Sequence, residues 1–372
     1  MNFDFSDEVK MMRDEARRFL KDRCPPGVVR RALDGAVVYD KELWKEIAEL
    51  GWIGVGIPEK FGGSGIGAEA LCVLAGELGA SLAPVPFSSS AYLAVEAILL
   101  AADDTQKRCL LPDVASGESI VTVALAEGPG NPSPGAVSTT YANGVLTGTK
   151  WPVPDGEVAD QAIVVAKDRD GEIGFYATAL DGEGVQRKTL KTIDPTRNYA
   201  TLVFRGASAT PLLANGKGWA LVEELLDRAA VFLAFEQVGG AETALYMARD
   251  YAMERYAFGR SIASFQAIKH KLADMYVALE LARAHAYYAA WAISSDALEL
   301  AGAAAAARVA ATDAYYLITK ENIQIHGGMG FTWEMDCHLY YRRAKALALL
   351  LGSAGYWRDR LIGELEHEEA AN

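Results

Sequence analysis

The chain has 372 residues, of which 51% are hydrophobic and 23% charged, so it can bury a large core and is long enough for two or three domains. Its 49 acidic and 36 basic residues give a net charge of −13, and no basic stripe interrupts this surplus. A nucleic-acid partner is therefore not expected. The four cysteines lack metal-ligand or CxxC spacing, which predicts no metal site and no disulfide framework and favours a reducing, cytoplasmic setting.

Neither export nor membrane insertion is expected. The first 19 residues carry five acidic side chains between Asp4 and Glu15, unlike the basic start of a signal peptide. The most apolar stretch, 297–311, is mainly alanine and is interrupted by Glu299 and Arg308. It is too short and too polar for a membrane span, so we expect a buried helix there.

Hydrophobic periodicity divides the chain into three parts. Residues 1–118 have apolar positions at helical spacing on both sides of a glycine-rich turn at 51–63, which predicts an N-terminal helical domain. From 119 to 213 the pattern changes to short β-branched runs separated by Gly, Pro, Asn and Asp, which predicts a central β-domain. The expected strands lie at 120–123, 162–166 and 201–204.

Residues 214–372 are dominated by helix formers, with no sustained heptad repeat, and this predicts a packed bundle rather than a coiled coil. The predicted helices span 219–255, 265–295, 298–322 and 335–366.

Two segments of this last part carry candidate binding chemistry. Around Arg255 and Phe258 a helix ends, turns on Gly259 and restarts beyond Phe265 and Gln266. A guanidinium at such a junction can present its planar fork to a pyrophosphate, although Arg255 alone is more simply explained as a solvated helix-end charge.

The second segment runs from Gln324 through Gly327 and Gly328. Exposed amides of a glycine turn can bind an anion, and the Gln324 amide can bind phosphate or the edge of a heterocycle. A lone GGxG is more often a helix C-cap. No GxGxxG follows a strand, so a Rossmann fold is not indicated.

Together the two segments resemble the FAD-binding signatures of acyl-CoA dehydrogenases. The run from Trp44 through Leu50-Gly51-Trp52, Ile57-Pro58-Glu59 and Phe61-Gly62-Gly63 to Glu77-Leu78-Gly79 resembles the helical domain of the same family. The resemblance implies an N-terminal helical domain, a central β-barrel domain, a C-terminal four-helix bundle, and a tetramer built as a dimer of dimers.

The resemblance also implies where FAD binds. The isoalloxazine ring contacts mainly one subunit, and the neighbouring subunit holds the adenosine pyrophosphate. The residues of this chain that match the second group are Arg255, Phe258, Phe265, Gln266, Gln324, Gly327 and Gly328.

The family positions for the catalytic base are vacant. Family enzymes remove the α-proton of the thioester with a glutamate while hydride leaves the β-carbon for flavin N5. In register with Arg343-Ala344-Lys345 that glutamate falls at Leu351. The alternative glutamate of some members falls at Ala229, and its neighbouring arginine at Ala230.

Glu236 is the candidate for a substitute base. It lies seven residues beyond Ala229, about two helical turns, and therefore on nearly the same helix face. Its apolar neighbours would disfavour the ionised form, which is one way to tune a base. The alternative is a buried glutamate bonded to a structural partner.

The flavin-facing strands also differ from the family. Its Thr-Glu-Pro-x-x-Gly-Ser-Asp becomes Ala126–Ser133, and its Trp-Ile-Thr becomes Pro152-Val153-Pro154. Two threonine hydroxyls are lost, and each proline removes a backbone donor. This weakens the expectation that the chain holds a flavin ring of its own.

Other polar residues have simpler interpretations. His326 is expected to be a hydrogen-bonded helix-end residue, since no second ligand accompanies it at metal spacing. His270 and His285 are expected on bundle faces. Asp227 matches residues that contact CoA in relatives, or it is a solvated helix charge. The acidic end at 364–369 is expected to be a solvated, frayed helix terminus.

Three hypotheses follow. In the first, the chain is an acyl-CoA dehydrogenase subunit in a hetero-oligomer, whose related partner supplies the base and the flavin-facing groups. Divided pairs of this kind suggest a bulky acyl-CoA such as a steroid side chain, with an electron-transfer flavoprotein or similar acceptor. In the second, it is a self-sufficient homo-oligomer with Glu236 as base. In the third, it is a structural or acyl-CoA-binding subunit without catalysis. The sequence leaves acyl chain length and oxidase reactivity open.

Overall fold

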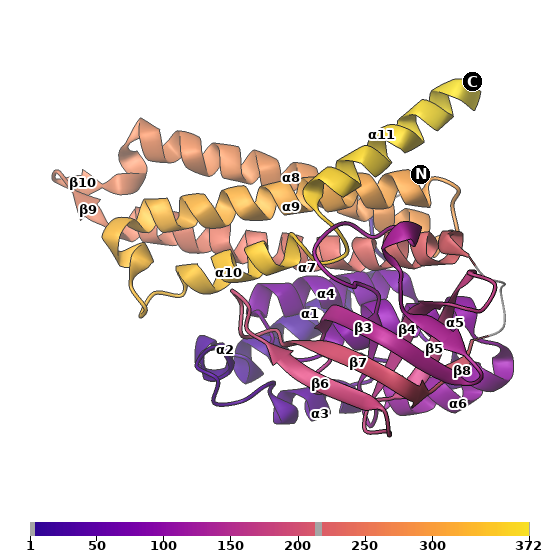
Figure 1. The fold of residues 1–372 in the computed structure, drawn as a ribbon. Helices are drawn as coiled ribbons and strands as arrows, with labels where there is room; N and C mark the ends of the chain where they lie inside the picture. The colour runs from indigo at the N-terminus through magenta and orange to yellow at the C-terminus, as the bar shows by residue number, and fades with distance from the viewer. Residues whose placement is uncertain (1–3, 213–217, 372) are drawn as a thin grey trace. The chain divides into compact units, whose positions relative to one another are not determined.

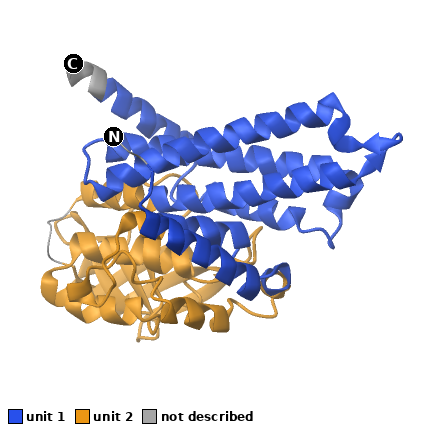
Figure 2. Ribbon diagram, turned by 180° about the vertical axis from the view of Figure 1, so that it is seen from behind, with its two compact units in different colours: residues 1–29, 72–83, 230–372 blue, residues 30–71, 84–229 orange. Residues whose placement is uncertain are grey.

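The computed structural model describes residues 4–212 and 218–371, with the side chains of 368–371 left out (Figure 1). Its elements follow the predicted order of a helical region, a sheet and a second helical region. By contacts the chain divides into two compact units (Figure 2). Unit 1 comprises residues 1–29, 72–83 and 230–372, and unit 2 comprises 30–71 and 84–229. The expected domain boundary at 118/119 stays a prediction, and the one at 213/214 lies outside the described residues.

Unit 2 contains the sheet. Eight strands follow the order β6-β7-β3-β2-β4-β5-β8, with β1 on β4, and β4 pairs parallel with β1 and β2 while the other ladders are antiparallel. The strands are β1 (Val121–Ala124), β2 (Thr140–Ala142), β3 (Val145–Pro154), β4 (Gln161–Lys167), β5 (Ile173–Ala179), β6 (Val185–Leu190), β7 (Tyr199–Ser208) and β8 (Thr210–Pro211).

Helices complete unit 2, and its core contains the fully buried strand β1 and the buried residues 162–166 of β4. These helices are residues 30–33 of α2 (Pro26–Leu33), then α3 (Lys41–Glu49), α5 (Val95–Ala101), α6 (Asp104–Ala115), the short helices η1 (Glu59–Phe61) and η3 (Pro134–Ala136), and the π-helix η2 (Ser88–Ala94). Capping follows local chemistry: Asp103 and Gln106 form a reciprocal capping box at the start of α6. The predicted strands at 120–123, 162–166 and 201–204 are confirmed within a few residues as β1, β4 and β7.

Unit 1 is the helical bundle. It contains α1 (Asp7–Arg23), most of α4 (Ala68–Ser81), α7 (Trp219–Glu254) from residue 230, α8 (Gln266–Ser294), α9 (Leu300–His326), α10 (Cys337–Leu347) and α11 (Ala354–Ala371), with β9 (Tyr256–Ala257), β10 (Arg260–Ser261), η4 (Ile262–Ser264) and η5 (Gly327–Phe331). The alanine-rich stretch 297–311 forms the start of α9 from Leu300 on, with the alanines at 303–305, 307 and 311 buried as expected, whereas Leu298 lies before the helix and is exposed. The predicted helix at 335–366 was wrong, because α10 and α11 are separate helices joined by a linker at 348–353.

Two close backbone contacts fix α4 against α7 inside unit 1. A Cβ on Gly239 would lie 1.9 Å from Gly76 O, and a Cβ on Gly79 would lie 2.0 Å from Glu236 O. Side chains larger than hydrogen cannot fit there, so the two helices meet backbone to backbone. This contact fixes the position of the stretch of α7 around Glu236 against α4.

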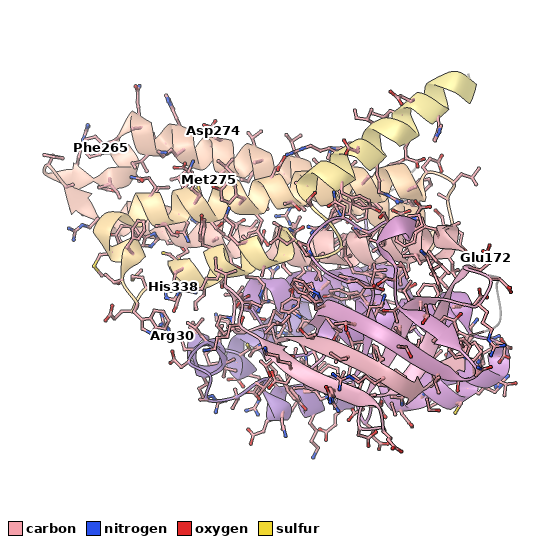
Figure 3. The ribbon with its side chains drawn as sticks, viewed as in Figure 1. Arg30, Glu172, Phe265, Asp274, Met275 and His338 are labelled. Atoms are coloured by element: carbon pink, nitrogen blue, oxygen red, sulfur yellow. The ribbon has the colours of Figure 1, made fainter. Side chains whose placement is uncertain are left out.

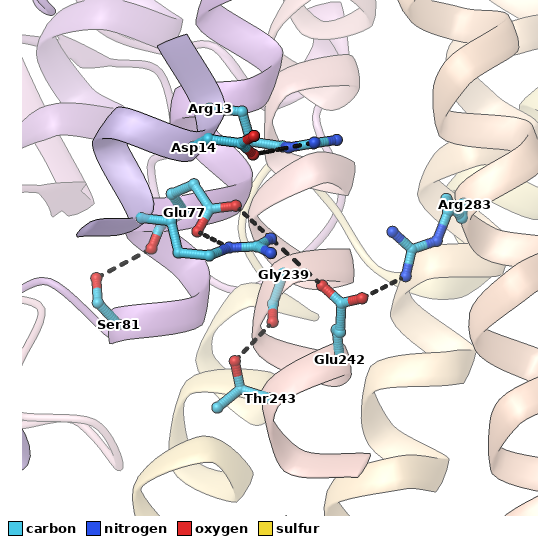
Figure 4. Close-up of polar contacts among 9 residues, drawn as sticks. Arg13, Asp14, Glu77, Ser81, Gly239, Glu242, Thr243 and Arg283 are labelled. Atoms are coloured by element: carbon cyan, nitrogen blue, oxygen red, sulfur yellow. Dashed lines mark hydrogen bonds and ion pairs between the residues drawn. The ribbon is translucent and has the colours of Figure 1, made fainter. Parts of the chain in front are cut away.

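An ion-pair network ties four helices of unit 1 together (Figure 4). Arg17 on α1 makes a bidentate pair with Glu77 on α4, at 2.7 and 3.1 Å. Glu242 on α7 accepts from Arg283 on α8 at 2.8 Å and lies 3.9 Å from Arg17. The network therefore anchors the N-terminal helix on the bundle.

Candidate functional site

A tight hairpin follows α7 at one end of unit 1 (Figure 1). Strands β9 and β10 pair antiparallel, and Ile262 N donates to Arg255 O at 2.8 Å. Phe258 and Gly259 form the turn, with φ of 53° and 78°. The Phe258 side chain is 96% exposed. A large aromatic ring held in a constrained turn and left in water indicates a surface that another molecule covers.

Cationic and aromatic groups flank this turn. The Arg260 guanidinium lies 4.1 Å from the Phe265 ring centroid, and the Phe258 ring meets Phe265 edge to face at 6.3 Å. Arg255 and Gln266 are exposed. Phe265 is the N-cap of α8 and makes no side-chain cap hydrogen bond; the Ile268 amide donates to Phe265 O at 3.1 Å, and the amides of Gln266 and Ala267 can donate to an anion.

The second predicted segment, from Gln324 to Gly328, forms the C-terminal end of α9 and the turn after it. Gly327 has φ of 60° and ψ of −136° at the C-cap, and a Cβ on Gly327 or Gly328 would meet nothing within 4 Å. Gly330 is different, since a Cβ there would lie 2.6 Å from Ile323 O. Gln324, Gly327 and Gly328 are all exposed. The turn thus offers open backbone and an amide side chain.

Two contacts bring the segments to the same end of unit 1. The Tyr251 ring, one turn before Arg255, stacks on His326 with centroids 4.1 Å apart. Lys271 in the second turn of α8 forms an ion pair with Glu321 near the end of α9. The residues that the resemblance assigns to FAD therefore share one exposed end of the bundle. We call this set the clamp: Arg255, Phe258, Phe265, Gln266, Gln324, Gly327 and Gly328.

His326 has the structural role expected from the sequence. It is buried, and its Nδ1 donates to Asn322 O at 2.9 Å. Burial lowers the pKa of its imidazole, which favours the neutral ring stacked on Tyr251. His270 and His285 are exposed on α8, and among the described residues no group of His, Cys, Asp and Glu could hold a metal ion.

Glu236 is sealed inside unit 1. Its side chain is 0% exposed, and Oε1 accepts from Nη1 of the equally buried Arg343 at 3.3 Å. Arg343 Nη2 also donates to Leu82 O at 3.3 Å. A base must reach the α-carbon of a thioester, so burial of this kind favours the structural alternative for Glu236.

A second buried arginine lies close to this pair. Arg308 on α9 donates from Nη1 to Gln237 Oε1 at 2.5 Å and to Thr312 Oγ1 at 2.7 Å. Its Nη2 donates to the carbonyls of Leu347 and Leu350. Burial lowers the pKa of Arg308 to about 9, and the charge of Glu236 opposes that shift.

Arg308 thereby holds the linker in which the sequence register predicts the family base. Leu351 sits in this linker with φ of 66°, in the left-handed region that favours glycine, and Gly352 follows at 107°. The other predicted position, Ala229, is buried on α7. Neither position offers a group that can accept a proton.

The predicted flavin-facing segments of unit 2 bond to each other. Trp151 N donates to Ala126 O at 2.8 Å, and Gly128 N donates to Trp151 O at 2.9 Å. Beside them, Glu127 pairs with Lys150 at 2.6 Å. Desolvation opposes ionisation of Glu127, but bonds from Lys150 and Ser138 lower its pKa to about 2. Burial lowers the pKa of Lys150 to about 8.

Asp227 is not the solvated charge that one alternative expected. It is buried on the start of α7 in unit 2. The match to CoA-contacting residues stays a prediction.

Sequence reasoning missed the buried partners of Glu236. Arg343 entered only as an alignment anchor, and Arg308 only as a charge in an alanine run. A lone arginine in a stretch of alanines is itself a signal, because a buried guanidinium needs acceptors from several elements.

Comparison with known proteins decides the family. A family model described as the N-terminal domain of acyl-CoA dehydrogenase matches residues 6–118, and the C-terminal domain model matches 216–364. Acyl-CoA dehydrogenase IpdE2 of Mycolicibacterium smegmatis is 33% identical over 361 residues, covering 97% of this chain and 99% of that protein. The chain belongs to the acyl-CoA dehydrogenase family. The predicted family and its helical, β, helical order are thus confirmed, and the chain is assigned to a family of oxidoreductases.

Solved structures agree. A variant of the steroid ACAD Tcur3481-Tcur3483 has a TM-score of 0.88 at 31% identity, covering 98% of this chain and 99% of that chain. The ChsE4-ChsE5 complex from Mycobacterium tuberculosis has a TM-score of 0.87 at 27% identity, with the same coverage. Within the described part of this acyl-CoA dehydrogenase family member, no helix is long and apolar enough to cross a membrane.

Proposed function

We propose that this chain is the clamp-bearing subunit of a hetero-oligomeric, FAD-dependent acyl-CoA dehydrogenase. The observation that carries the proposal is the contrast between an open clamp and closed base positions. Phe258 is 96% exposed, whereas Glu236 is 0% exposed and paired with Arg343. The chain offers half of a cofactor site and needs the other half from a neighbour.

The residues at the clamp fit the adenosine pyrophosphate half of FAD. Arg255 supplies a bidentate fork for phosphate oxygens, and the α8 first-turn amides add donors. The open backbone at Gly327 and Gly328 lets a phosphate approach, and the Phe258 ring gives a surface for stacking. Bound FAD would supply the acceptor for the hydride that leaves the β-carbon.

The remaining chemistry falls to a related subunit. A carboxylate must take the α-proton, and Leu351 and Ala229 cannot do so. The backbone donors of Trp151 and Gly128 are already used within unit 2. Two of the similar structures carry paired names, Tcur3481-Tcur3483 and ChsE4-ChsE5, and the first is named a steroid ACAD. We therefore propose a steroid-like acyl-CoA as substrate and an electron-transfer flavoprotein as acceptor.

The test replaces the clamp. Arg255→Ala combined with Gln324→Ala, in the chain purified with its partner subunit, is expected to remove bound FAD while the helical content of the complex is kept. Arg249→Ala is the matched control, because this arginine is exposed on α7 and pairs with Asp250. Unchanged FAD content in the double variant would refute the proposal.

A further inference from the structure

The hairpin after α7 carries a second arginine that the clamp does not include. Arg260 on β10 pairs with Ala257 on β9, and two residues further from the turn Ile262 N donates to Arg255 O. Residues opposite one another, and alternate residues of one strand, share a face of a hairpin. Arg255 and Arg260 are therefore diagonal neighbours on one face, with Cβ atoms about 7–8 Å apart. Since Ala257 on this face is short, both cationic side chains can reach one ligand.

An aromatic ring orients the Arg260 guanidinium. The guanidinium carbon lies 4.1 Å from the centroid of the Phe265 ring, which Figure 3 labels beside the hairpin. Phe258 meets the same ring edge to face at 6.3 Å. A guanidinium that stacks by its face keeps its N–H donors at the edge, where phosphate oxygens can accept from them. Stacking thus orders Arg260 before a ligand binds.

No acidic side chain competes for the two arginines in this part of the chain. Among the residues that the structure describes, neither Arg255 nor Arg260 has an ion-pair partner. The sequence from 255 to 273 contains no Asp or Glu, and the first acid after it is Asp274, also labelled in Figure 3. In a chain with a net charge of −13 this stretch is a local cationic surface, so an anion that binds there meets no like charge on it.

We propose that Arg260 is a second pyrophosphate-binding residue of this chain, so that Arg255 binds one phosphate of FAD and Arg260 binds the other. The assignment rests on the proposed function, because it concerns the same exposed end of unit 1. Each phosphate of the dinucleotide carries one negative charge, and two guanidiniums on one face match the diphosphate in charge and in fork geometry. A mononucleotide would engage only one of them.

Another exposed arginine of unit 1 shows what distinguishes Arg260. Arg249 on α7 also stacks on a ring, with its guanidinium 4.5 Å from the Tyr246 centroid, but it pairs with Asp250 at 2.7 Å. The charge of Arg249 is therefore compensated within the chain. Arg260 has the same kind of aromatic support and no acid beside it, which makes Arg249 its matched control.

Coenzyme A contains the same adenosine diphosphate chemistry as FAD, and position favours FAD as the ligand. Arg260 stacks on Phe265 and lies across the hairpin from Arg255, and both of these residues belong to the clamp. The residue that matches CoA contacts, Asp227, lies in unit 2 and is buried. The experiment measures the two ligands separately.

FAD release tests the second arginine. Arg260→Ala, in the chain purified with its partner subunit, is expected to raise the FAD dissociation constant about 10-fold or more, read from the fluorescence of flavin released on dilution. Affinity should also fall less steeply with added salt than in the parent complex, because one ionic contact is lost. Arg260→Lys keeps the charge without the planar fork, so it should restore the salt dependence and only part of the affinity. Arg249→Ala should change neither.

Further measurements on the same preparations distinguish the possible failures. The dissociation constant of free coenzyme A, measured by calorimetry, is expected to be the same in Arg260→Ala and in the parent complex. Weaker coenzyme A binding with unchanged FAD affinity would overturn the proposal. Unchanged FAD affinity and salt dependence in Arg260→Ala would also overturn it, but the proposed function would stand if Arg255→Ala with Gln324→Ala still loses FAD. If that double variant keeps its FAD as well, both fail.

Discussion

Replacement of Glu236 by glutamine separates a structural carboxylate from a catalytic one. The side chain is 0% exposed, its partner Arg343 is 1% exposed, and the two lie 3.3 Å apart. Loss of one member leaves the other charge buried without compensation, which costs about 3–5 kcal/mol. Glutamine keeps a hydrogen-bond acceptor for Arg343, so we expect the lower end, about 3 kcal/mol of unfolding free energy.

The assay has two readouts on the same preparation. Urea unfolding followed by circular dichroism should show the lost stability, and turnover per bound FAD should stay within a few-fold of the parent complex. If Glu236 were the base, turnover would fall by about 100-fold or more.

A double variant isolates the contribution of the Glu236–Arg343 ion pair to stability. Glu236→Leu with Arg343→Met removes both buried charges, and we expect it to recover most of the stability lost by either single change. Turnover that collapses in Glu236→Gln while stability is unchanged would refute the structural role.

Three further outcomes follow from the structure. Gly239→Ala should destabilise the fold by about 3 kcal/mol or more in urea unfolding, because the new Cβ would lie 1.9 Å from Gly76 O. Gly363→Ala is the control, since a Cβ at Gly363 would meet no atom within 4 Å, and it should stabilise α11 by about 0.5–1 kcal/mol. Burial raises the pKa of Glu96 from 4.5 to about 7, so between these pH values the folded chain holds a proton that the unfolded chain releases. The free energy of unfolding should therefore fall by at most about 3 kcal/mol as the pH rises from 4.5 to 7. In Glu96→Gln this dependence on pH should be weaker. A thiol reagent should modify Cys109 alone in the native chain and all four cysteines in urea, and rapid native labelling of a second thiol would contradict the burial of the others.

Periodicity was sufficient for the long helices α7 and α8 and for three strands of unit 2, β1, β4 and β7. Helices α7 and α8 begin and end within a residue of the prediction, because their apolar residues repeat over many turns. The break between α10 and α11 was missed. The leucine-rich run there favours helix, but α10 ends at Leu347, and Arg308, which lies 39 and 42 residues earlier in the chain, donates to the carbonyls of Leu347 and Leu350.

In the candidate site, too, some features could be predicted from the sequence and others could not. The clamp residues could be proposed from the sequence because two short motifs together resemble those of the family, and their role stays a prediction. The role of Glu236 could not, since its partner Arg343 lies 107 residues away and no local pattern joins them. Ion pairs between distant elements depend on the packing of whole helices, such as the glycine contact between α4 and α7.

Counting flavin in the purified complex tests the divided site most directly. The account predicts that this chain purified alone retains little or no FAD and gives no acyl-CoA turnover. With its related subunit, the complex should hold one FAD for each pair of unlike chains. One FAD per copy of this chain alone, together with turnover of an acyl-CoA, would contradict it.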